Sequence, residues 1–211
     1  MDVNHLVQTI AIFALPVILA ITLHEAAHGY VARHFGDMTA YAQGRVSLNP
    51  VRHIDIVGTI VVPLLILLFS GGVFLFGWAK PVPVNVSALR KPRQHMAWVA
   101  AAGPGANLVM ALGWALLYHL AHLMPSFFAL PLGLMALAGI RVNLVLMFLN
   151  LLPILPLDGG RIVASLLPGR AAWQYAKLEP WGLPVIVLLL VTGTLGTVLR
   201  PLVTVSESLL R

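Results

Sequence analysis

Five apolar runs, most of them near the length that crosses a lipid bilayer, constrain this 211-residue chain more than any other feature. A membrane-spanning helix needs about 20 consecutive apolar residues. Only 9% of the residues are charged, whereas an average soluble domain carries about a quarter. The sequence therefore predicts an all-α polytopic protein of the cell membrane, in contact with the lipid bilayer. The runs are roughly 6–31, 57–76, 96–119, 131–152 and 181–199.

The polar stretches between the runs are short. The longest, 33–55 and 79–93, are too small for a soluble domain, so residues 1–211 are expected to form a single integral-membrane domain. The first run is not expected to be a cleavable signal peptide. It is too long for an h-region, and no Lys or Arg precedes it.

Lys and Arg gather in three clusters beside the runs, namely Arg33, Arg45 and Arg52; Lys80, Arg90, Lys91 and Arg93; and Arg161, Arg170 and Lys177. Loops rich in these residues stay on the cytoplasmic side, yet five full crossings would put the first two clusters on opposite sides. A re-entrant run 57–76 would make all three clusters cytoplasmic. Re-entry is therefore the favoured topology, and an ordinary crossing is the alternative. Membrane orientation also accounts for the net charge of +6, so no nucleic-acid partner is expected.

The first run contains the sequence ITLHEAAHGY at residues 21–30. On a helix, His24 and His28 project from one face and can share one metal ion, with Glu25 beside them. Zinc lowers the pKa of its bound water to about 7, and a carboxylate can then accept the proton as hydroxide attacks a carbonyl group. Ionisable residues are costly inside a membrane, so this group indicates a function. The chain has no cysteine, so every further ligand must be His, Asp or Glu.

Asp158 is the predicted third ligand, because a catalytic zinc takes three protein ligands and keeps one open position. It follows a long apolar run in the stretch NLLPILPLDGGR, where two prolines interrupt the helix. A helix N-cap for residues 159–167 is the other role open to Asp158. His24 lies roughly 27 Å along its run, so the two residues meet only if the runs 6–31 and 131–152 point the same way. A re-entrant run 57–76 gives that direction.

These motifs resemble those of the site-2 protease family of intramembrane zinc metalloproteases, over most of the chain to about residue 168. The resemblance rests on His24-Glu25-x-x-His28, on Gly103-Pro104-x-x-Asn107 and on Asn150-x-x-Pro153-x-x-x-Leu157-Asp158-Gly159. The stretches GRVSLNP (44–50), HID (53–55) and GWAKPVPVN (77–85) resemble the compact prokaryotic members, which lack PDZ and CBS domains.

The resemblance implies a zinc endopeptidase that cleaves a transmembrane protein substrate. The clusters of Lys and Arg predict that its active site lies near the cytoplasmic side. His24, His28 and Asp158 would bind one Zn²⁺ per chain, and Glu25 would be the general base that later protonates the leaving amine. The predicted substrate-binding residues are Asn150, Asn143 and Asn107. Helix packing is the other role open to Asn143. A small β-like membrane-associated element, formed by segments 44–50 and 78–85, would pair with an unwound substrate.

Two other functions stay open from the sequence. One is a catalytically silent homologue that binds membrane helices, although every metal and base residue is present. The other is an ion or proton transporter, in which the same buried ionisable residues would line a path. The 150–159 motif argues against the transporter.

Overall fold

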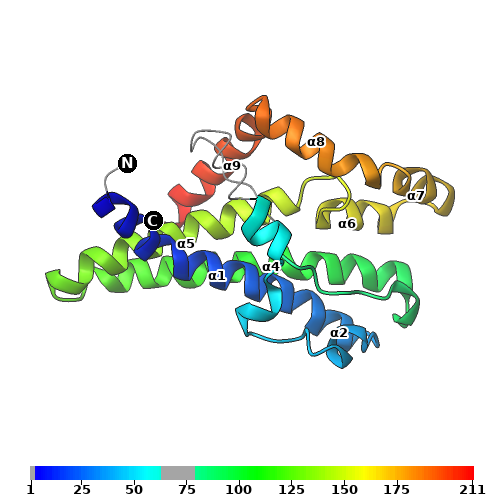
Figure 1. Ribbon diagram of the computed structural model, residues 1–211, viewed down its shortest axis with the longest axis horizontal. Helices are drawn as coiled ribbons and strands as arrows, with labels where there is room; N and C mark the ends of the chain where they lie inside the picture. Colours follow the sequence, from blue (N-terminus) through cyan, green and yellow to red (C-terminus); the bar gives the residue numbers. More distant parts are fainter. Residues whose placement is uncertain (1–2, 63–78) are drawn as a thin grey trace.

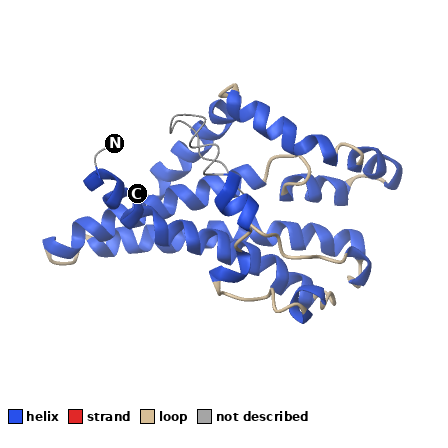
Figure 2. Ribbon diagram, viewed as in Figure 1, coloured by secondary structure: helices blue, strands red, loops and turns tan. Residues whose placement is uncertain are grey.

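The computed structural model describes residues 3–62 and 79–211, and all regular secondary structure in these residues is helical (Figures 1 and 2). The α-helices are α1 (Val3–His34), α2 (Thr39–Ala42), α4 (Pro92–Ala121), α5 (Ser126–Asn150), α6 (Asp158–Leu166), α7 (Gly169–Ala176), α8 (Glu179–Val191) and α9 (Thr194–Leu210). The short 3₁₀ and π elements are η1 (Pro50–His53), η2 (Ile56–Val61) and η3 (Val86–Ala88).

Three helices of the described residues, α1, α4 and α5, are long and apolar enough to cross a membrane. A fourth span results if α8 and α9 are counted as one bent span. The all-α prediction is therefore confirmed, whereas a set of five spans is not. Most of the predicted run 57–76 lies outside the described residues, and so does the choice between crossing and re-entry.

The helices α1, α4 and α5 form the core, with α4 antiparallel to the other two (Figure 1). Small residues let these helices approach closely, as is usual between helices in membranes. At Gly139 of α5, for example, a side chain would overlap the indole of Trp114 on α4. The runs 6–31 and 131–152 therefore point the same way, as the metal prediction requires.

The expected fifth run, 181–199, is divided and not continuous. The helices α8 and α9 meet at an angle of 78°, where Gly193 takes a positive φ of 75° that favours glycine. Beyond this bend α9 packs on α5 (Figure 1). The buried Glu207 of α9 lies 3.0 Å from Arg141, a charged residue inside the apolar α5. This ion pair was not predicted, although a charge inside an apolar run is a visible signal.

The β-like element expected at 44–50 and 78–85 is not observed, because no strand occurs in the described residues of these segments. The backbone explains why. Pro81 and Pro83 have no N–H to donate to a sheet. The amide of Val82 donates to the Glu25 carboxylate, and that of Asn85 donates to Asp37.

Candidate metal centre

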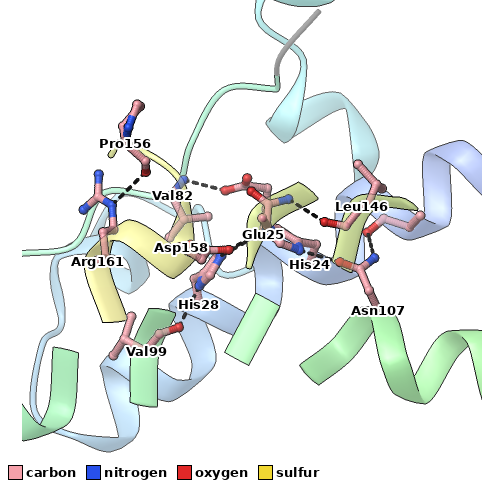
Figure 3. Close-up of polar contacts among 12 residues, drawn as sticks. His24, Glu25, His28, Val82, Val99, Asn107, Leu146, Pro156, Asp158 and Arg161 are labelled. Atoms are coloured by element: carbon pink, nitrogen blue, oxygen red, sulfur yellow. Dashed lines mark hydrogen bonds and ion pairs between the residues drawn. The ribbon is translucent and has the colours of Figure 1, made fainter. Parts of the chain in front are cut away.

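Three predicted ligands converge at the centre of the molecule. His24 and His28 come from one face of α1, and Asp158 comes from the first turn of α6 (Figure 3). The two Nε2 atoms lie 3.2 Å apart, and they lie 3.2 and 3.4 Å from the Asp158 Oδ2. All three residues are buried. The structure therefore brings together His24 and Asp158, which are 134 positions apart in the sequence.

The outer nitrogen of each imidazole is held by an oxygen. His24 Nδ1 lies 2.6 Å from the Asn107 Oδ1, and His28 Nδ1 lies 2.7 Å from the Val99 carbonyl oxygen. A carbonyl oxygen only accepts hydrogen bonds, so each neutral ring carries its proton on Nδ1. Both Nε2 lone pairs therefore point into the centre. This tautomer is the one in which Nε2 can bind a metal.

The donor set fits a zinc ion. For ligands about 2.0–2.1 Å from a tetrahedral zinc, neighbouring ligand atoms should lie about 3.3 Å apart, and the three observed separations are 3.2, 3.2 and 3.4 Å. The buried Asp158 Oδ2 receives no hydrogen bond in the described structure. Two lone pairs and an oxygen that face one another without a proton repel, so a cation is needed between them.

The Asp158 carboxyl is ionised near neutral pH. Burial raises the pKa of Asp158, but a hydrogen bond or a positive charge from His24 and His28 outweighs burial and lowers the pKa to about 2. With both Nε2 atoms unprotonated, a bound cation must supply that positive charge. Asp158 makes no capping hydrogen bond, since Leu157 occupies the N-cap position of α6. The N-cap role considered for Asp158 is therefore not observed, and its carboxylate is directed at the two histidines (Figure 3).

The helix α4 supports the two imidazoles directly. A Cβ on Gly103 would lie 2.6 Å from the His24 Cε1 and closer still to the His28 Nε2. One turn later, Asn107 orients His24. The Gly103-Pro104-x-x-Asn107 motif therefore has a physical role here. Its glycine lets the helix approach the histidines, and its asparagine fixes one of them.

The asparagines predicted to bind substrate lie in two different settings. Asn107 and Asn143 are fully buried, and the Asn107 Nδ2 donates to the Asn143 Oδ1 at 2.9 Å. Asn143 in turn donates to the Gly139 carbonyl oxygen at 2.8 Å. These two side chains thus extend the network behind His24. Asn150, at the end of α5, is only half-buried, and its Nδ2 donates to the Leu146 carbonyl oxygen.

Glu25 lies beside the three ligands and is held by the segment 79–85. Its Oε2 accepts a hydrogen bond from the Val82 backbone amide at 2.8 Å (Figure 3). The same segment is fixed by two buried charged residues that were not predicted. Arg45 donates to the Lys80 carbonyl oxygen at 2.7 Å, and Asp37 accepts from the Asn85 amide at 2.7 Å. No spacing pattern in the sequence points to these long-range contacts.

Comparison with known proteins places the chain in a family. The pattern of "Peptidase family M50" matches residues 124–193. Over 192 residues the chain is 40% identical to "Putative zinc metalloprotease YwhC" of Bacillus subtilis (strain 168). The aligned residues make up 89% of this chain and 84% of that protein. The chain belongs to peptidase family M50. This is the site-2 protease family, so the predicted resemblance is confirmed and the chain is classed as a metalloprotease.

More distant members of the family show the same likeness. "Putative zinc metalloprotease Rip2" of Mycolicibacterium smegmatis is 30% identical over 181 residues, or 85% of this chain and 66% of that protein. Rip2 of Mycobacterium tuberculosis (strain H37Rv) is 29% identical over the same shares of the two chains. The chain thus spans about two thirds of the length of these Rip2 relatives. No solved structure matches it.

Proposed function

We propose that this protein is an intramembrane endopeptidase that holds one Zn²⁺ per chain between His24, His28 and Asp158. The observation that carries the proposal is the convergence of three unprotonated donor atoms, 3.2–3.4 Å apart, beside a helix that is apolar enough to cross a membrane. When bound, zinc supplies a Lewis acid and a water molecule of lowered pKa.

Glu25 is the proposed general base. Its Oε2 is engaged by the Val82 amide, which leaves Oε1 to accept a proton from the attacking water. The same carboxyl then donates that proton to the leaving amine of the cleaved peptide bond. Asn107 and Asn143 are assigned to the orientation of His24, in place of substrate contact, because both are fully buried. Asn150 remains the candidate for binding the substrate backbone.

The site is proposed to lie near the cytoplasmic side of the membrane. His28 is six residues before the end of α1, a distance of about 9 Å along a helix, and Arg33 lies in the last turn. Arg93, in the first turn of α4, and Arg161, in α6, belong to elements that meet at the same end. Positive residues mark cytoplasmic loops, so this end of the helices is assigned to the cytoplasmic side.

The proposed substrate is a transmembrane segment of another protein, because the site lies beside a helix that is apolar enough to cross a membrane.

Zinc removal tests this function. The protein is purified in detergent and incubated with a single-span model substrate, with and without a zinc chelator. We expect cleavage within or next to the transmembrane segment, located by mass spectrometry, which is lost on chelation and restored by added zinc. Cleavage that survives in metal-free protein, or that occurs only in the soluble tails of the substrate, would contradict the proposal.

Replacing Val82 by proline tests how Glu25 is positioned. Val82→Pro removes the amide that holds the Glu25 Oε2, so we expect the turnover rate to fall about 10–100-fold while bound zinc, measured by atomic absorption, is unchanged.

Val84→Pro is the matched control for this change. It also follows a proline, and within the described residues no hydrogen bond is made by the Val84 amide. If segment 79–85 paired with substrate as a strand, both variants would lose activity. Equal loss would therefore refute the Glu25 interpretation.

A further inference from the structure

The connection between α5 and α6, residues 151–157, carries the Asp158 ligand and has little structure of its own. Pro153 and Pro156 lack amide protons, and its internal hydrogen bonds include only short-range ones such as Ile154 to Leu152 and Leu157 to Ile154. A connection of this kind needs support from neighbouring elements to keep one conformation.

Among the described residues, no hydrogen-bond donor holds the Asp158 Oδ2 in place. The facing Nε2 atoms of His24 and His28 carry lone pairs. Before a cation binds, these atoms repel the carboxylate. The backbone on either side of Asp158 must therefore hold the carboxylate in place, as the supporting groups of a metal site commonly do.

The helix α8 lies directly against this connection. Gly182, in the first turns of α8, is buried, and a Cβ there would lie 2.6 Å from the Leu155 carbonyl carbon and would overlap the carbonyl oxygen. A neighbouring atom of the Leu155–Pro156 unit, the Pro156 Cδ, would lie 3.2 Å away. The atoms in the way belong to backbone and a proline ring, which cannot rotate aside. Only glycine fits this contact.

The connection 151–157 makes two more contacts with neighbouring helices. A Cβ on Gly160 of α6 would lie 2.5 Å from the Leu155 amide nitrogen. Leu155 thus contacts Gly182 through its carbonyl group and Gly160 through its amide nitrogen, and Gly160 is two residues from Asp158. In addition, the Tyr175 hydroxyl of α7 donates to the Pro153 carbonyl oxygen at 2.9 Å. A shift of α8 would therefore be passed through Leu155 to the start of α6.

We propose that Gly182 is a positioning residue of the metal centre: it lets α8 lie on the Leu155 carbonyl and thereby fixes the Asp158 carboxylate opposite the histidines. Tyr175 assists by holding Pro153. The proposal rests on the proposed function, since it takes His24, His28 and Asp158 as the zinc ligands. It gives α7 and α8 a part in metal binding, although neither helix supplies a ligand.

The test measures zinc release from Gly182→Ala protein. We expect zinc to pass to a chromogenic chelator about 10–100-fold faster than from the unmodified protein, as when the supporting groups of a zinc ligand are altered. The visible spectrum of the cobalt-substituted protein should also change, because the Asp158 carboxylate is displaced. Gly196→Ala in α9 is the matched control, since a Cβ there meets nothing within 4 Å.

The direction in which the melting temperature changes in Gly182→Ala separates a positioning role from a role in helix stability. Alanine is a better helix former than glycine. If Gly182 served α8 alone, the alanine variant would therefore melt at a higher temperature and keep its zinc. Zinc release at the unmodified rate in both alanine variants would overturn the proposal. Failure of the unmodified protein to bind zinc would instead overturn the proposed function.

A milder variant decides the outcome if Gly182→Ala does not fold. Tyr175→Phe removes one hydroxyl group from a side chain that is half-buried, and the fold should tolerate it. We expect zinc release about two- to fivefold faster, from the loss of one hydrogen bond, with an unchanged melting temperature. In that event, release at the unmodified rate from Tyr175→Phe would overturn the proposal.

Discussion

Glu25→Gln is expected to lower the cleavage rate at least about 10²–10⁴-fold, the usual contribution of a general base, while the protein keeps one zinc per chain. Glutamine has the shape of glutamate, and its amide oxygen can still accept the hydrogen bond from the Val82 amide. It cannot accept a proton from the attacking water. Initial rates on a single-span substrate and zinc content on the same sample measure the two effects together.

Glu179→Gln is the matched control for this substitution. It makes the same chemical change at an exposed position in the first turn of α8, so both the cleavage rate and the zinc content should stay at the unmodified level. Cleavage that persists in Glu25→Gln would remove Glu25 from the mechanism. Loss of zinc from Glu25→Gln would show that this carboxylate belongs to the metal site and is not a base.

The proximity of His24, His28 and Asp158 could be predicted because local rules determine it. His24 and His28 are four residues apart, so any helix places them on one face. Asp158 could be found because acidic residues are scarce in this chain and because it follows a long apolar run broken by prolines. The common direction of α1 and α5 followed from the charge clusters. Each of these inferences needs only helical geometry and the cost of charge in a membrane.

The surroundings of the ligands could not be predicted in the same way, since they depend on contacts between distant segments. The sequence does not show that Asn107 faces His24, or that Asn143 lies behind Asn107. Asn107 and Asn150 in the motifs, and Asn143 one heptad before Asn150, therefore suggested substrate contact, although Asn107 and Asn143 are buried. The segment 78–85 was expected to supply a strand because of its resemblance to the family, but the side chains of Glu25 and Asp37 accept hydrogen bonds from two of its amides.

The bend at Gly193 and the ion pair between Arg141 and Glu207 also depend on contacts between distant segments, and so could not be predicted. Hydropathy alone favours one continuous run across 181–199, since a single glycine is common within membrane helices. The bend lets α9 turn back onto α5, where Glu207 finds its partner Arg141. A charged residue inside an apolar run indicates that a partner exists, but it does not identify the helix that supplies it.

Gly103→Ala is expected to lower the affinity for zinc about 100-fold, the upper end for changes beside zinc ligands. The added methyl group would overlap the His28 Nε2 and lie 2.6 Å from the His24 Cε1. The rings cannot move aside at low cost, because their Nδ1 atoms are held by Asn107 and the Val99 carbonyl. Zinc content after dialysis against a weak chelator, together with the cleavage rate, measures the loss.

Gly105→Ala separates this contact from any general effect on α4. Gly105 lies two residues further along the same helix and is exposed, and a methyl group added there would meet nothing within 4 Å. Because alanine is a better helix former than glycine, this variant should keep its zinc and melt no lower than the unmodified protein. If Gly103→Ala binds zinc as tightly as Gly105→Ala does, α4 does not support the histidines. The approach of α4 to α1 would then be a packing feature without a part in the metal site.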